Sequence, residues 1–188
     1  MLKNDRNGIK NELLLFSNLK VLVMAAFFVA LSIVCGKLLA FNVGSVLRFS
    51  LENFPIIMSA ITFGPLVGAA TAVVADLVGC LIVGYEINPL ITVGALSIGL
   101  LSGAMYKLFK DMRLFPKLCL SVFIAHLVGS VGIKTVGLSA FYSLPLEVLA
   151  LWRLLNYTII GVIELFLLYH LLKSKAITDQ IERIKHTH

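Results

Sequence analysis

Long apolar stretches constrain the fold of this chain more than any other feature of its sequence. Six of them follow one another between residues 19 and 172, and most approach the length of about 20 residues that a helix needs to cross a bilayer. Hydrophobic residues make up 59% of the chain and charged residues only 14%, and the mean hydropathy is +0.97. Soluble domains do not have this composition. The sequence therefore predicts an all-α fold, an integral membrane bundle of six transmembrane helices.

The apolar stretches divide the chain into three parts. We expect a cytoplasmic or interfacial N-terminal segment over residues 1–18, a six-helix membrane domain over 19–172, and a weakly ordered, basic cytoplasmic tail over 173–188. The predicted membrane segments are 19–41, 51–63, 65–83, 89–109, 118–136 and 146–172. The second is about half the length of a full span, so we expect it to be short, strongly tilted or shielded by other helices.

Basic residues indicate the orientation of the bundle. With six segments, twelve of the sixteen basic residues fall on one side, together with both termini. Basic loops stay on the cytoplasmic side of a membrane, so we predict that both termini are cytoplasmic. These twelve residues are Lys3, Arg6, Lys10, Lys20, Lys107, Lys110, Arg113, Lys117, Lys173, Lys175, Arg183 and Lys185.

The remaining charges gather in the outer half of the bundle, where the orientation rule gives no reason to collect them. Mutual pairing is one interpretation, because it offsets the cost of burying charge. The other is a pocket, open to the outside, for a polar and preferably anionic small molecule. Four basic groups favour the pocket. The outer charges are Lys37, Arg48, Lys134, Arg153, Glu52, Asp76, Glu86 and Glu147.

Helical spacing predicts which way some of these side chains point. Asp76 continues a row of small residues, Gly64, Gly68 and Ala72, so it should face packed protein and not lipid. Glu52 has an alternative role in the first turn of a helix, where a carboxylate favours the helix dipole. For Lys37, near a helix end, the alternative is snorkelling to the interface.

Two later helices also carry polar rows. His126, Ser130 and Lys134 share one helical face, and His126 is either a proton carrier or a hydrogen-bonding partner within the bundle. The last helix carries Arg153, Asn156, Tyr157 and Glu164 on roughly one face. We expect an external loop over residues 137–145, in which Tyr142 suits the headgroup level or a cover over a ligand.

Ala26 and Ala30 form a pair of small residues one helical turn apart, which lets another helix approach closely. Packing within the same chain is the alternative to a partner surface. The three cysteines, Cys35, Cys80 and Cys119, lie inside apolar runs and are predicted to be small core residues.

Several classes of function are excluded or disfavoured. The chain lacks the metalloprotease, serine hydrolase and nucleotide-loop motifs and the paired aspartates of membrane transferases, so we expect no enzyme, no catalytic or metal-binding residues and no cofactor. Its formal charge of +6 follows the orientation rule and does not indicate nucleic-acid binding. A small self-sufficient secondary transporter is possible, although we see no internal repeat.

Four segments resemble a known family. They are RFSLENFP at 48–55, FGPLVG at 63–68, ADLVG at 75–79 and INPLITVG at 87–94. They look like the membrane-embedded substrate-binding (S) components of energy-coupling factor vitamin transporters, within them the folate family. The pair of alanines at 26 and 30 is similar to the motif by which S components dock on their coupling subunit. The resemblance covers about residues 21–172.

The resemblance implies a six-helix protein of the bacterial cell membrane that captures a vitamin from outside. Its partners would be a transmembrane coupling subunit and two cytoplasmic ATPases, and its ligand folate or a reduced folate. A carboxylate suits the N–H donors of a pterin edge, and Arg or Lys suits the glutamate tail. Another vitamin or a pterin- or purine-like base is the alternative. The substrate-binding residues we expect are Arg48, Glu52, Asp76, Asn88, Lys134, Tyr142, Arg153 and Asn156, with Ala26 and Ala30 on the coupling subunit.

Overall fold

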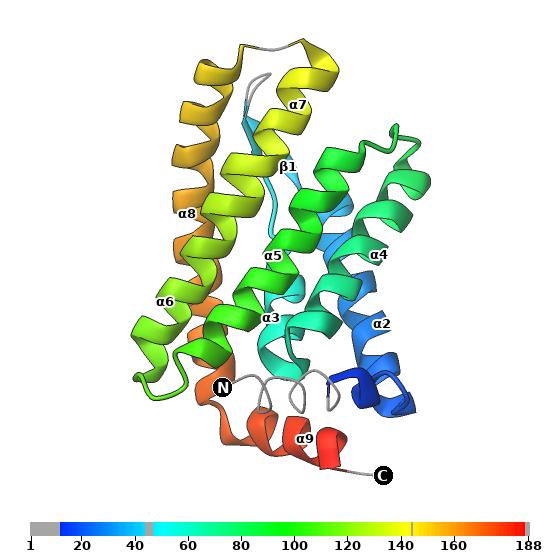
Figure 1. The fold of residues 1–188 in the computed structure, drawn as a ribbon, viewed down its shortest axis with the longest axis vertical. Helices are drawn as coiled ribbons and strands as arrows, with labels where there is room; N and C mark the ends of the chain where they lie inside the picture. The colour runs from blue at the N-terminus through cyan, green and yellow to red at the C-terminus, as the bar shows by residue number, and fades with distance from the viewer. Residues whose placement is uncertain (1–11, 44–46, 144, 187–188) are drawn as a thin grey trace, which may run out of the picture.

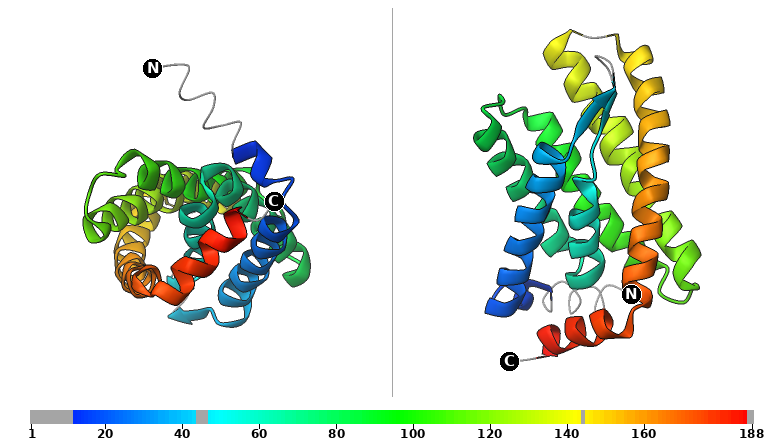
Figure 2. Two further views of the ribbon diagram at one scale, coloured as in Figure 1. Left: turned by 90° about the horizontal axis from the view of Figure 1, so that it is seen from below. Right: turned by 180° about the vertical axis from the view of Figure 1, so that it is seen from behind.

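The computed structural model describes residues 12–43, 47–143 and 145–186, which form a bundle of helices with their long axes roughly side by side (Figure 1). A short antiparallel hairpin lies between α2 and α8 at one end, and α9 runs across the other (Figure 2). The elements are α2 (Leu19–Ile33), the π-helix η1 (Val34–Leu38), β1 (Phe41–Val43), β2 (Leu47–Phe49), α3 (Asn53–Phe63), α4 (Pro65–Val83), α5 (Pro89–Leu108), α6 (Leu114–Ala125), the π-helix η2 (His126–Ile133), α7 (Lys134–Tyr142), α8 (Leu146–Lys173) and α9 (Lys175–His186).

Five helical segments of the described chain are long and apolar enough to cross a membrane. They are Leu19–Leu38, Pro65–Val83, Pro89–Leu108, Leu114–Tyr142 and Leu146–Lys173. The remaining apolar helix, α3, has only 11 residues. The all-helical membrane fold is therefore confirmed apart from the hairpin, whereas the count of six spanning helices is not confirmed.

The short helix α3 is shielded by its neighbours, one of the arrangements expected from its length. Ten of its residues, Pro55 and Phe63 among them, are buried, and α3 packs against α2, α4 and α5. A helix that is apolar on every side must be enclosed by other elements. The chain then turns sharply at Gly64, whose φ of 105° lies in the left-handed region that favours glycine. Pro65 starts α4 in the first-turn position that proline tolerates.

Small residues bring α3, α4 and α5 into backbone contact. A Cβ built on Gly68 lies 2.3 Å from the Cβ of Ala60, and one built on Gly99 lies 2.3 Å from the carbonyl oxygen of Gly68. A Cβ on Gly103 lies 2.8 Å from the backbone of Pro65. The predicted row of small residues on α4 therefore faces small residues of α3 and α5, as in other close-packed membrane helices.

The polar end of the bundle differs from the expectation in two places. The loop expected after residue 41 contains the hairpin, in which Phe41 pairs with Phe49 and their rings stack at 5.5 Å. The loop expected over residues 137–145 is mostly helix, because α7 continues to Tyr142 and ends at Ser143, with φ of 53°. Gly137, which suggested a turn, is buried where a Cβ would meet the Cβ of Leu90 at 2.8 Å.

The opposite end is closed by the terminal segments. After Lys173 the chain forms α9 and not the weakly ordered tail that we expected, because Ile177, Ile181 and Ile184 turn one apolar face toward the bundle. Asn18 Nδ2 donates to the carbonyl of Ile184 at 3.3 Å. Near the start of α4, Glu12 Oε2 accepts from the backbone N–H of Leu66 at 3.1 Å, and Glu12 also pairs with Lys107.

The close packing of α3 on α4 predicts the effect of Gly68→Ala. The added methyl overlaps Ala60, so the two helices must move apart, and overpacking of this kind costs about 1–3 kcal/mol. We expect a lower thermal unfolding temperature of the detergent-purified protein. Gly132→Ala is the matched control, because a Cβ there meets only the carbonyl of Leu127, at 3.4 Å. Equal unfolding temperatures for the two variants would contradict the packing described here.

Candidate ligand-binding site

A cavity of about 610 Å³ lies at the end of the bundle near the hairpin. Its wall combines apolar side chains from α5, α7 and α8 with charged groups from several elements that are distant in the sequence. Six of the eight residues predicted to bind a ligand line this cavity, namely Glu52, Asp76, Lys134, Tyr142, Arg153 and Asn156. The structure therefore brings most of the outer charges together in one place.

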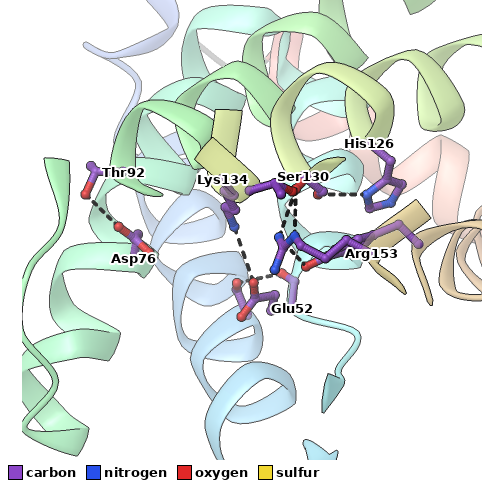
Figure 3. A network of polar contacts seen from close by, with 10 residues as sticks. Glu52, Asp76, Thr92, His126, Ser130, Lys134 and Arg153 are labelled. Atoms are coloured by element: carbon purple, nitrogen blue, oxygen red, sulfur yellow. Dashed lines mark hydrogen bonds and ion pairs between the residues drawn. The ribbon is translucent and has the colours of Figure 1, made fainter. Parts of the chain in front are cut away.

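Lys134 and Glu52 form an ion pair across the cavity wall. Lys134 begins α7 and is only 5% exposed, and its Nζ lies 3.4 Å from Glu52 Oε1 (Figure 3). Glu52 occupies the N-cap position of α3, where a carboxylate favours the helix dipole, but its side chain makes no capping hydrogen bond. Glu52 also packs on η1, where a Cβ built on Gly36 would lie 2.9 Å from Oε2.

Asp76 reaches the cavity from α4, whereas the row of small residues predicted only that it faces protein and not lipid. Its Oδ2 accepts a hydrogen bond from Thr92 Oγ1 of α5 at 2.7 Å (Figure 3). Among the described residues Asp76 has no ion pair with a lysine, arginine or histidine. The carboxylate is therefore available to accept further hydrogen bonds from a ligand.

Arg153 lies on α8 and is held by groups without net charge. Its Nε and Nη2 donate to the carbonyl of Ser130 in η2, at 3.1 and 2.9 Å (Figure 3). The guanidinium carbon lies 5.0 Å from the centre of the Tyr157 ring. In the described chain no carboxylate lies within 4 Å of this guanidinium. Arg153 thus presents a positive charge to the cavity that a ligand carboxylate can pair with.

Two of the eight predicted ligand contacts, Asn88 and Arg48, are not among the cavity-lining residues that the structure describes. Asn88 is buried and is not among the residues that line the cavity. Its amide is used for structure, since Oδ1 accepts from the N–H of Leu90 at 3.0 Å and Nδ2 donates to the carbonyl of Gly137 at 3.1 Å. Arg48 belongs to β2, opposite Asn42, and its side chain lies outside the described part.

Three further aromatic or basic residues line the cavity and were not among the predicted ligand contacts, namely Lys37, Tyr85 and Tyr157. Lys37 of η1 lies beside Tyr85, with Nζ 5.3 Å from the ring centre, within the range of a cation–π contact. Tyr157 lies under Arg153, four residues later on α8. A signal for Lys37 existed, because it is one of the four outer basic residues.

Ala26 and Ala30 are exposed on α2, away from the cavity. Leu22, Val23 and Phe27 beside them are exposed as well. The alternative of packing within the same chain is therefore not observed. An apolar face with a small-residue stripe can contact lipid or another membrane helix.

Comparison with known proteins gives the family. The family model described as "ECF transporter, substrate-specific component" matches residues 20–175. The chain belongs to this family. The resemblance read from its motifs is thus confirmed, and the family is a transporter binding component and not an enzyme family. No curated protein matches the chain.

Two solved structures share the fold of this S component. A crystal structure of FolT bound with folic acid aligns at a TM-score of 0.67 and 21% identity, covering 81% of this chain and 90% of FolT. The S component of a bacterial ECF transporter aligns at a TM-score of 0.59 and 18% identity, covering 82% and 98%. At these identities the likeness concerns the fold alone.

Proposed function

We propose that this S component binds a folate in the cavity and delivers it through a coupling subunit and two ATPases of an energy-coupling factor transporter. The observation that carries the proposal is the separation of charge within one apolar-walled cavity. Asp76 on α4 offers an acceptor, and Arg153 on α8 offers a cation with no carboxylate partner in the described chain. A few well-placed polar groups in an apolar pocket are typical of small-molecule sites.

The chemistry of folate fits this separation. The pterin edge carries adjacent N–H donors that a carboxylate can accept, so Asp76 or Glu52 would orient the ring system. The two carboxylates of the glutamate tail suit Arg153, Lys134 or Arg48, because charge-assisted hydrogen bonds are the strongest that side chains form. Asn156 and Tyr142 would complete the wall or the cover. A volume of about 610 Å³ lies within the usual range of about 300–1,000 Å³ for such sites.

The match to FolT, crystallised with folic acid, supports folate over other vitamins. This support comes from a neighbour of 21% identity, so the ligand needs a direct test. S components for other vitamins would bind riboflavin, pantothenate or thiamine in the corresponding cavity. These compounds differ in charge and in hydrogen-bond donors, which makes them suitable competitors.

We predict saturable binding of folate to the purified protein in isothermal titration calorimetry, with no binding of riboflavin, pantothenate or thiamine. Asp76→Asn and Arg153→Met should each lower the affinity for folate by about 2–5 kcal/mol, because a ligand group is left desolvated without its partner. Glu147→Gln is the control. Glu147 is exposed and does not line the cavity, so its loss should cost under about 1 kcal/mol.

Two other outcomes of the titration would contradict the proposal. Binding of a different vitamin would reject folate and keep the class of the protein. Binding of none of the four by a folded protein would remove the main support for vitamin capture.

The exposed face of α2 is the proposed docking surface for the coupling subunit. Ala26→Leu or Ala30→Leu should abolish folate uptake by cells while the purified protein keeps its affinity for folate, because the added bulk separates two helices without reaching the cavity. Ala140→Leu, the same change on an exposed part of α7, should leave uptake intact. Loss of uptake and affinity together would show that the alanines serve the fold of this chain.

We propose further that both termini are cytoplasmic and that the cavity opens outward. The turn between α5 and α6 and helix α9 lie at one end of the bundle, and the hairpin lies at the other (Figure 1). In a background lacking Cys35, Cys80 and Cys119, Glu147→Cys should react with a membrane-impermeant maleimide added to intact cells, and Arg113→Cys should not. Both positions are exposed. The reverse labelling pattern would invert the predicted topology.

A further inference from the structure

Two ionisable side chains lie deep in the bundle and do not line the cavity. His126 of η2 is 2% exposed and Glu164 of α8 is fully buried, and His126 Nε2 lies 2.6 Å from Glu164 Oε2. Glu164 Oε1 has no hydrogen-bond partner in the described chain. Ionisable groups inside a membrane bundle are costly and occur where function uses them. Their presence therefore needs an explanation beyond packing.

The contacts of His126 lead directly to the cavity wall. Its Nδ1 is hydrogen-bonded to Ser130 Oγ at 3.1 Å, and the carbonyl of the same serine accepts both hydrogen bonds from Arg153 (Figure 3). The His126 ring also stacks on Tyr157, with centroids 5.1 Å apart and an interplanar angle of 28°. Tyr157 is the aromatic residue under the Arg153 guanidinium. His126 thus touches both supports of Arg153.

Glu164 fixes the orientation of His126. A carboxylate that accepts from one ring nitrogen determines which way an imidazole faces, as carboxylates do behind metal-bound histidines. Both Glu164 and Arg153 belong to α8, whereas His126 and Ser130 belong to η2. The series of contacts therefore runs from Glu164 on α8 to His126 and Ser130 on η2, and from there back to Arg153 on α8. These contacts hold the two elements together beside the cavity.

We propose that His126 and Glu164 are positioning residues, which hold Arg153 and Tyr157 in the orientation that binds the carboxylates of an anionic ligand. The inference rests on the proposed function and extends it to the selection of anionic ligands. A free arginine side chain loses much rotamer freedom when it binds, and a side chain that is already held loses less. The pair would therefore raise affinity for the charged end of the ligand and leave the rest of the molecule unaffected.

A purely structural cross-link between η2 and α8 makes a different prediction. It would lower stability when broken, and it would weaken the binding of every ligand to the same degree. Folate and pteroate separate the two cases, because pteroate has the same pterin and benzoate rings but lacks the glutamate. The comparison thus isolates the ligand end that Arg153 is proposed to bind.

Calorimetry of the full-length protein with folate and pteroate is the first test. Glu164→Leu and His126→Leu should each lower the affinity for folate by about tenfold and that for pteroate by less than about threefold. Glu164→Gln keeps an oxygen acceptor for His126 and should restore most of the affinity for folate. His170→Leu, on the exposed face of α8, is the control and should bind both ligands normally.

A double-mutant cycle tests whether the effect passes through Arg153. In an Arg153→Met background, Glu164→Leu should have no further effect on folate affinity, since the side chain that it positions is gone. Additive losses, or equal losses for folate and pteroate, would overturn the proposal. If Glu164→Leu does not fold, Ser130→Ala provides the same comparison with a smaller change, because it removes the hydroxyl that contacts His126 and keeps the carbonyl that accepts from Arg153.

A measurement without ligand keeps this inference separate from the proposed function. The rate at which phenylglyoxal modifies Arg153, followed by mass spectrometry, reports how firmly its guanidinium is held. The rate should rise severalfold in His126→Leu and stay unchanged in His170→Leu. Failure of the wild-type protein to bind folate would reject the proposed ligand, whereas an unchanged modification rate in His126→Leu would reject the positioning role itself.

Discussion

The structure depends on the direct contact of three helix backbones, α3, α4 and α5. Gly68 faces Ala60 on one side and Gly99 on the other, at distances that leave no room for a larger side chain. Because small residues allow this approach, van der Waals contact can hold helices together in a medium that supplies no hydrophobic driving force. The contact helps to enclose α3, which is too short to cross a bilayer alone.

Charge at the cavity is tolerated because each group is supported by a different part of the bundle. Lys134 pairs with Glu52, Asp76 accepts from Thr92, and Arg153 donates to a backbone carbonyl in η2. π-helical turns often occur at functional sites, and here η1 carries Lys37 and η2 precedes Lys134. These charged residues are held by separate elements, so a ligand that contacts several of them also connects the two sides of the cavity.

Much of the site could be predicted because membrane burial makes charged residues conspicuous. An ionised group in an apolar run must face protein or water, so the outer charges pointed to one region of the bundle. The structural contacts of Asn88, its capping of α5 and its hydrogen bond to α7, could not be inferred from the sequence. Snorkelling stood as the alternative for Lys37, because only the folded chain places Tyr85 beside it. Gly137 suggested a loop because a buried helical glycine and a turn glycine look the same in the sequence.

The sequence by itself determined the membrane class, the small-residue face of α4, and the end of the bundle at which charge collects. Each of these follows from local periodicity or from the cost of charge in hydrocarbon, which depend on a residue and its near neighbours. Only the tertiary structure decided that Lys134 pairs with Glu52, 82 residues away, and that Glu164 meets His126, 38 residues away. Partners between helices depend on how the backbones cross, and that crossing is set by contacts over the whole bundle.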